Sequence, residues 1–425
     1  MRFVKKTVPA LVLALAVVFS LGVGISYAEK SAPTYTDVPE TYWGYEAIAK
    51  WSTKEYGILQ GYGNGMFGPN DPITAEQLAW INGRICGIAD TDAKYEGNGK
   101  RQLTRAEAVA IIAQAFCIEP LEYTSNTFAD NANIPAMYRG YVNAMKAAGY
   151  IQGMGNNTFG PNSTYTRAQA LQVIYNMISD ITDKNASNVN AADNYVIRKA
   201  GVQLKDSTIN GNLIVGHGVG DGEVTLDNVT VNGKLIVFGG GSNSIIVRGK
   251  SSIANIDVYK TTGQPVRIKV EGEAVVKTVT VANDGKVIVN GAITTLIADD
   301  NTSVELQKAQ VANISVTGSS VTMNVDSGSA VKTVAISASN VKLTGSGKVE
   351  TVTVAESAKS GVVVDTKGTK VSVAQGAGDV TDSSGKVIVK SGETKTTAGT
   401  STTYPSGGGS TSRPTPSGSG SGRAS

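Results

Sequence analysis

Two arginines stand where a helix least favours a positive charge. Arg105 and Arg167 each follow a threonine that opens a helix-like run, in the sequences TRAE and TRAQ. A cation at the first helical position opposes the helix dipole, so local stability does not explain it. A guanidinium beside free helix-start amides is suited to bidentate capture of a carboxylate or phosphate. These two residues are therefore the leading candidates for binding an anionic ligand.

A second kind of chemistry could come from carboxylates in the valine-rich half of the chain. Polysaccharide lyases and hydrolases need clustered acids on one face, with or without calcium. The candidates are Asp206, Asp221, Asp227, Asp299 and Asp300. Scattered Asp and Lys on outward strand positions are normally a solvated face that blocks lateral aggregation. We therefore predict no catalytic residue and no enzyme, with a polysaccharide lyase or hydrolase as the alternative.

The bulk composition excludes other classes of function. His217 is the one histidine and lies in a glycine-rich stretch, so His-based catalysis and multi-His metal sites are excluded. The net charge of +3 is small and mixed in sign, which gives no support to nucleic-acid binding. The two cysteines, Cys86 and Cys117, are too few for a disulfide scaffold. A bridge between them and two separately buried thiols both remain open, and we expect no cofactor and no metal.

The threonine before each arginine can be explained by the start of the helix itself. A threonine at the N-cap accepts a hydrogen bond from the third helical amide, and a Glu or Gln there returns one. Three pairs fit this capping box, namely Thr74 with Gln77, Thr104 with Glu107, and Thr166 with Gln169. We therefore expect three helices that begin in the same way.

The loops before two of these helices carry nearly the same text. Gly61 to Thr74 reads GYGNGMFGPNDPIT, and Gly153 to Thr166 reads GMGNNTFGPNSTYT. Each has a glycine- and asparagine-rich turn, one phenylalanine that we expect to be buried, and Gly-Pro-Asn. A loop repeated at a long period marks a repeated module.

These motifs, together with the DVP…W opening, resemble the S-layer homology (SLH) family, whose three-repeat modules anchor bacterial surface proteins to the cell wall. The resemblance implies a mostly α-helical, pseudo-threefold module with repeats at 34–88, 89–122 (shortened) and 123–183. It also implies grooves that bind anionic secondary cell-wall polysaccharide or, in some relatives, modified peptidoglycan. The groove residues carried over from the family are Arg105, Arg167, Asp37, Asp130, Trp43, Gly61 and Gly153.

The sequence departs from the family pattern at several places. The first repeat has Ala75 where the arginine should be, and the second lacks the segment with Asp and Trp. The third repeat has Tyr138 or Tyr141 near the place of the tryptophan. At most two of the three grooves should therefore be able to bind the ligand.

The segment 195–389 has a different character, with short alternating runs of Val, Ile and Thr and few aromatic residues. Leu204-KDSTINGNLIVG and Leu226-DNVTVNGKLIVF match at an offset of 22 residues. Alternation puts one face inside, and a period of about 17–22 residues is typical of a β-solenoid. We predict a parallel β-solenoid of about nine coils. An immunoglobulin-type sandwich is the alternative, but sandwiches need aromatic core anchors.

The amino-terminal end of the chain suggests export. Residues 1–28 read as a signal peptide, with Arg2, Lys5 and Lys6 before an apolar run. No membrane span is expected after its removal. A polar connector is predicted at 185–192, and a disordered Ser/Gly/Pro/Thr tail at 394–425. The sequence therefore predicts a secreted α + β multidomain protein of the cell wall or S-layer, structural or adhesive, with possible self-association.

Overall fold

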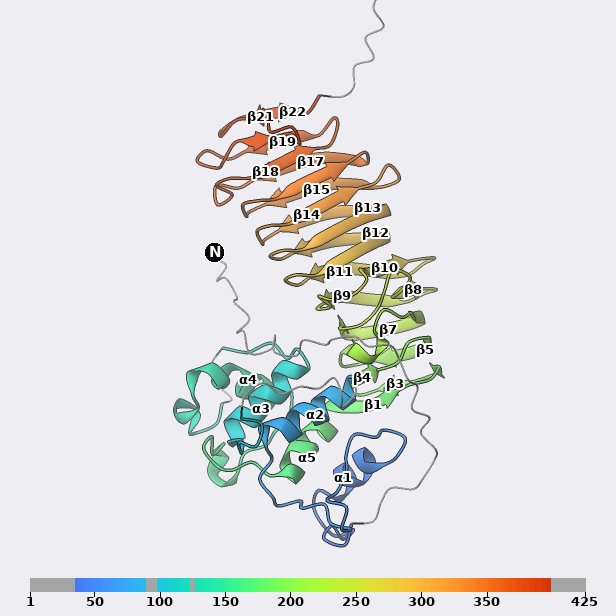
Figure 1. Cartoon of the computed structure of the whole chain (residues 1–425), viewed down its shortest axis with the longest axis vertical. Helices are drawn as coiled ribbons and strands as arrows, with labels where there is room; N and C mark the ends of the chain where they lie inside the picture. Colours follow the sequence, from blue (N-terminus) through green and yellow to red (C-terminus); the bar gives the residue numbers. More distant parts are fainter. Residues whose placement is uncertain (1–34, 89–97, 123–126, 399–425) are drawn as a thin grey trace, which may run out of the picture.

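The computed structural model describes residues 35–88, 98–122 and 127–398. The predicted signal peptide and most of the predicted tail lie outside these residues. Figure 1 shows a helical module at one end and a rod of stacked strands rising from it. The helical elements of the described residues are α1 (Tyr45–Ser52), α2 (Ala75–Ile85), α3 (Arg105–Ala115), η1 (Asn131–Asn133), α4 (Ala136–Ala147), η2 (Gly155–Asn157), α5 (Arg167–Met177) and η3 (His217–Val219).

The rod is a β-solenoid of about ten turns, as the short alternating runs predict. Its strands are β1 (Ile178–Thr182), β2 (Ala186–Ser187), β3 (Asn190–Ala191), β4 (Asn194–Ile197), β5 (Val202–Ile209), β6 (Leu213–Val215), β7 (Val224–Val237), β8 (Ile246–Arg248), β9 (Ser252–Val258), β10 (Val266–Val270), β11 (Val275–Val281), β12 (Lys286–Ala298), β13 (Ser303–Val316), β14 (Thr322–Val325), β15 (Ala330–Ile336), β16 (Lys342–Gly345), β17 (Lys348–Val354), β18 (Val362–Asp365), β19 (Lys370–Val373), β20 (Val380–Thr381), β21 (Val387–Val389) and β22 (Thr394–Thr396).

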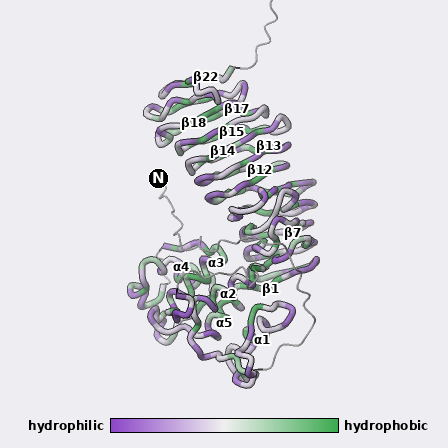
Figure 2. The backbone as a smooth tube through the Cα atoms, viewed as in Figure 1, coloured by the Kyte–Doolittle hydropathy of each residue, from purple (hydrophilic) through white to green (hydrophobic). Residues whose placement is uncertain are grey.

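Each turn of the rod pairs in parallel with the turns before and after it. The period-two alternation points one residue in two inward, as in Val334 and Ile336 of β15. Figure 2 shows the resulting mixture of hydrophobic and hydrophilic segments along each turn. The turn corners need a left-handed backbone, which stacked residues such as Asn301 (φ 58°) and Asn340 (φ 60°) supply.

Three corrections to the sequence-based boundaries follow. The solenoid begins at Ile178, directly after α5, so there is no separate connector, and β2 and β3 belong to its first turn. Those strands are only two residues long, which is why their pattern is too short to recognise. At the other end, β22 covers Thr394–Thr396, inside the predicted tail. Both β21 and β22 pair antiparallel with the last turns and so cover the open end of the ladder.

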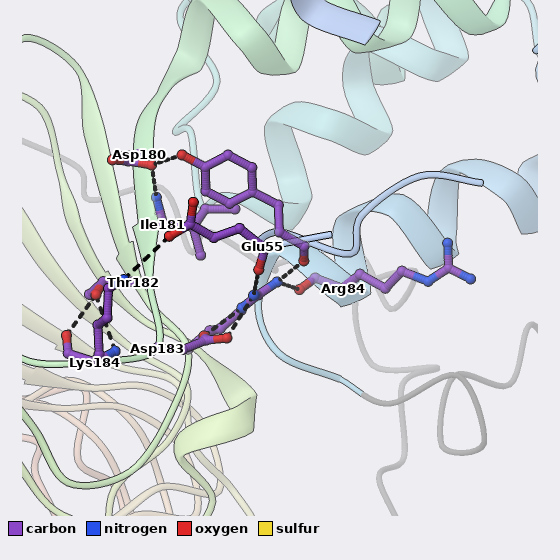
Figure 3. A network of polar contacts seen from close by, with 9 residues as sticks. Glu55, Arg84, Asp180, Ile181, Thr182, Asp183 and Lys184 are labelled. Carbon is purple, nitrogen blue, oxygen red and sulfur yellow. Dashed lines mark hydrogen bonds and ion pairs between the residues drawn. The ribbon is translucent and has the colours of Figure 1, made fainter. Parts of the chain in front are cut away.

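One sheet of the rod, here called face A, docks onto the helical module. Face A is the column of parallel segments that includes β1, β4, β6, β9 and the ends of β7, β11, β12, β13, β15 and β17, finishing at β19. On its first turns the outward residues are apolar, and Val196, Ile214 and Ile236 belong to the helical core. Arg198 fixes the same junction, because it bonds Asp183 and also donates to the carbonyls of Tyr56 and Arg84 (Figure 3).

Candidate functional site

The three helix starts are arranged around a ring of backbone hydrogen bonds. The Ile73 amide donates to the Tyr165 carbonyl (2.8 Å), Leu103 to Ile73 (3.1 Å), and Tyr165 to Leu103 (3.1 Å). Each of these residues lies one position before the N-cap threonine of α2, α3 or α5. The ring therefore gives the module its approximate threefold arrangement, with the middle copy as a full member.

Each of the three helices begins with a complete capping box. The threonine side chains of Thr74, Thr104 and Thr166 accept from the third helical amide in every case. The side chains of Gln77, Glu107 and Gln169 return a bond to the N-cap amide. These six residues thus build the helix starts.

The expectation of free amides beside the arginines was wrong. The Arg167 amide donates to Asp71 and the Ala168 amide to Pro69. In the same way the Arg105 amide donates to Ser163 and the Ala106 amide to Pro161. The Gly-Pro-Asn loop of one repeat therefore occupies the helix start of another, and only side chains can offer bonds to a ligand there.

Arg167 crosses to the loop of the first repeat, a surface here called groove 1. Its Nε donates to the Phe67 carbonyl (3.2 Å) and an Nη to the Gln60 carbonyl (3.4 Å). The guanidinium lies 4.5 Å from the ring centre of Phe67 and 5.1 Å from that of Tyr62. Only 7% of Arg167 is exposed. The guanidinium of Arg167 is therefore largely enclosed between the Phe67 and Tyr62 rings and the loop carbonyls.

Arg105 makes the matching arrangement with the loop of the third repeat, here called groove 2. One Nη donates to the Gln152 carbonyl (2.7 Å), and the guanidinium lies 5.0 Å from the Phe159 ring centre. The Nε of Arg105 has no hydrogen-bond partner among the described residues. Arg105 is more exposed than Arg167 and keeps an unused donor.

The two aspartates predicted for the grooves hold the loops together. The Asp37 carboxylate accepts from the Phe67 and Gly68 amides (2.8 and 2.7 Å). Asp130 accepts from Phe159 and Gly160 in the same way (2.6 and 2.8 Å). Burial raises the pKa of Asp37, but these backbone bonds outweigh it and hold the pKa below its usual value.

The two glycines predicted for the grooves permit a close approach within the same loops. A Cβ on Gly61 would lie 2.5 Å from the Met66 carbonyl oxygen, and one on Gly153 would lie 2.9 Å from that of Thr158. Both contacts are closer than side chains tolerate, so glycine is needed at each position. Like the aspartates, these glycines fix the conformation of the loops that form the grooves.

The rims of the two grooves differ. Tyr62 (49% exposed) stands at groove 1, where it also donates to Asp71 (2.8 Å). Trp43 (57% exposed) lies against Tyr42, whose hydroxyl donates to Asn70 of the same loop (3.1 Å). Groove 2 has Met154 in the place of Tyr62, beside a shallow depression lined by Asn133 and residues 160–163. Sequence reasoning missed Tyr62 and Asp71, although an exposed aromatic residue inside a glycine-rich loop was a visible signal.

The third helix start is built differently. Ala75 takes the place of the arginine and is buried, as its small side chain allows. The neighbouring loop supplies Arg101, whose Nη1 donates to both oxygens of the Glu107 carboxylate (2.8 and 2.9 Å). The cation there is engaged with the capping acid of α3.

The carboxylates of the rod are tied into its turns. Asp227 pairs with Arg248, Asp221 with Lys260, and Asp206 accepts from Asn228. Asp299 accepts from the Thr317 hydroxyl (3.0 Å), and Asp300 accepts from the Ser319 amide and hydroxyl. Among the described residues, no cluster of three His, Cys, Asp or Glu side chains could hold a metal ion.

The fold and the grooves define a class: a pseudo-threefold helical module carrying a β-solenoid. Residues 34–79 and 127–171 match the S-layer homology domain family, so the chain carries SLH domains at the first and third repeats. Domains of this family are found in proteins of the bacterial cell surface, and the match indicates a surface protein of this kind.

Two curated proteins share part of the sequence. The chain is 26% identical over 161 residues to cell surface glycoprotein 1 of Acetivibrio thermocellus, covering 37% of this chain and 6% of that protein. It is 24% identical over 178 residues to an amylopullulanase of Thermoanaerobacterium thermosulfurigenes, covering 34% of this chain and 9% of that protein. The chain therefore spans less than a tenth of either relative. Within the described residues, no helix has the length and apolar character to cross a membrane.

Proposed function

We propose that the helical module binds an anionic wall polysaccharide, or modified peptidoglycan, in grooves 1 and 2. The rod then serves as a non-enzymatic extension displayed from the wall. Arg105 and Arg167 supply the positive charge, and Trp43 and Tyr62 offer faces on which a sugar ring can stack. Asp37, Asp130, Gly61 and Gly153 shape the loops that hold these side chains.

The observation that carries this proposal is the direction of the helices. Both arginines lie at helix N-termini, whereas the C-terminal ends of α2 and α5 meet the rod. The Cys86 carbonyl after α2 accepts from Gly218 (2.9 Å), and β1 follows α5 without a linker. An 11-residue helix is about 16 Å long. A ligand in the grooves and the rod are therefore at opposite ends of the module.

Wall sedimentation tests the anchor. Purified walls should retain the full chain, and walls stripped of their polysaccharide should retain much less if that polysaccharide is the ligand. Arg105→Ala should weaken binding by about tenfold or more, because a charged hydrogen bond contributes about 1.5–3 kcal/mol. Trp43→Ala gives a second variant whose exposed side chain is not needed for folding. Arg248→Ala, on the rod, is the matched control for charge.

Equal sedimentation of Arg105→Ala, Trp43→Ala and the parent would overturn the proposed grooves. Circular dichroism should show unchanged helix content in each variant, since Arg105 also contacts its neighbouring loop.

A polysaccharide-cleaving rod is the second candidate, and one observation favours it. Burial raises the pKa of Asp299, which stands beside Asp300, and a general acid in a glycosidase also has a raised pKa. Both carboxylates nevertheless bond the next turn, as corner residues do. Sugar release from acidic polysaccharides by the full chain, lost in Asp299→Asn, would establish this candidate instead.

A further inference from the structure

Face A continues well beyond the part that the helical module covers. Its first turns are covered through Val196, Ile214 and Ile236. From β11 onward, six successive segments of face A, on β11, β12, β13, β15, β17 and β19, carry none of the module's core contacts. The same sheet is therefore an interface at its base and an open surface above.

The open part of face A is unlike the rest of the rod surface. Its outward residues are mostly Thr, Ser and Ala, as in Thr278 and Thr280 or Thr351 and Thr353. Lys370, on the last of these segments, is their one charged outward residue. Charged residues instead stand along the flanking corner, as Lys277, Lys332 and Glu350. Charges on outward strand positions protect sheets from association, and the open part of face A carries them only at its last segment.

Two hydroxyls of this surface are hydrogen-bonded within the rod. The Thr333 hydroxyl donates to the Asn313 side chain (2.7 Å) and the Thr353 hydroxyl to the Val334 carbonyl (3.5 Å). A shallow depression runs across the distal segments and is lined in part by Ala335, Thr353, Ala355 and Ser372. A partner would therefore meet small side chains with little rotamer freedom left to lose.

We propose that the open part of face A binds a second copy of this chain, with the two rods side by side and antiparallel. The established contact of face A with the module shows that this sheet accepts a packed layer. Segments about 4.8 Å apart form ridges that match those of another solenoid. The helical module projects from the base of face A, so two parallel rods would collide there, whereas antiparallel rods place the modules at opposite ends.

The area that two copies would bury indicates how strongly they should associate. Six segments about 4.8 Å apart and about five residues wide give a footprint of about 500 Å² on each copy. Specific interfaces bury about 800 Å² on each partner, so this contact belongs to the weak class. Association should therefore be visible at high concentration, as on a crowded wall, and not in dilute solution.

Sedimentation velocity of the full chain over a range of concentrations tests the contact. The parent should pass from monomer to dimer, and Ala335→Lys, in the centre of the surface, should remain monomeric at concentrations about tenfold higher. Ala292→Lys is the matched control, because Ala292 is also an exposed alanine on an outward strand position but lies on another face. Monomer at every concentration, or equal loss in both variants, would overturn the proposal.

Cross-linking distinguishes the two orientations. Thr280→Cys and Ser372→Cys lie at opposite ends of the surface. Cys86 is buried and Cys117 half-buried, so the parent chain is the control for linking through the native thiols. In the antiparallel pair a short bismaleimide should link Thr280→Cys to Ser372→Cys in a mixture, and neither to itself. Self-linking of each variant would indicate parallel rods and contradict the proposal. Ala335→Lys should still sediment with walls, so failure here is separate from failure of the anchor.

Discussion

The helical module and the rod reach a stable core by different routes. The module is closed around its ring of three helix starts, and large side chains such as Trp51, Phe67, Phe116 and Phe159 fill its centre. The rod repeats one small inward pattern of valine and isoleucine from turn to turn. A closed core needs no covers, but a stacked one does, because each end exposes a ladder edge and an apolar layer.

The comparison explains the few aromatic residues of the rod. Between residues 184 and 398 the sequence has only Tyr195, Phe238 and Tyr259. Phe238 and Tyr259 pack against the helical core, and His217 stacks on Phe238 with ring centres 4.8 Å apart. Phe238 and Tyr259 therefore lie where the rod meets the module. The first turns pack their inward residues in the core of the rod and their outward residues against the helices.

Placing a charge at the junction should have the largest effect. Ile236→Asp buries a carboxylate without a partner against the helices, and we expect a loss of about 4 kcal/mol or more, or failure to fold. Ala335→Asp changes the same face at an open position and should cost about 0.5 kcal/mol or less. Urea unfolding followed by the helix signal measures both, and similar losses in the two variants would mean that module and rod fold independently.

Acid should weaken the same junction to a smaller extent. Burial lowers the pKa of His217 from 6.5 to about 4. Between these values the unfolded chain binds more protons than the folded one, so stability falls as pH falls. We expect a loss of about 1–2 kcal/mol between pH 7 and pH 5. The loss should be absent in His217→Gln, and an equal loss in both proteins would assign it to other groups.

The smallest expected effect is a gain in the stability of the helical module. Cys117 follows α3 with φ 52°, in the place that Gly87 (φ 79°) takes after α2 and Gly149 (φ 77°) after α4. Cys117→Gly should stabilise the module by about 0.5–1 kcal/mol, because glycine adopts this conformation without strain. Gly87→Ala is the opposite control, since its Cβ would lie 2.6 Å from the Arg198 carbonyl oxygen. Thermal unfolding compares the two, and a destabilised Cys117→Gly would indicate that thiol packing outweighs the strain.

The repeated motifs allowed much of this architecture to be predicted. The capping boxes at Thr74, Thr104 and Thr166 are local, so the sequence specifies them without reference to distant residues. The solenoid class followed from the alternation, as in Val334 and Ile336, which is also local. The boundary at Ile178 could not be predicted, because β1 to β3 are short and gain their partners only from later turns.

For the grooves too, one part could be predicted from local sequence and another part could not. Arg105 and Arg167 stood out from the sequence because each breaks a local rule of helix charge. That their neighbouring amides are occupied depends on loops from other repeats, at Asp71 and Ser163, and no local pattern reveals it. The glycan-binding roles of these residues remain predictions for the wall sedimentation assay.

The amino-acid sequence alone determined the local structure of this protein. It determined where helices start, which strand residues point inward, and which turns need asparagine or glycine. Only the tertiary structure decided that α5 runs directly into the first turn and that the module and rod share a face. Those outcomes depend on contacts between residues far apart in the chain, such as Arg198 with Tyr56 and Ile236 with the helical core. Such contacts form only after both partners have folded, so neither partner's own sequence pattern contains them.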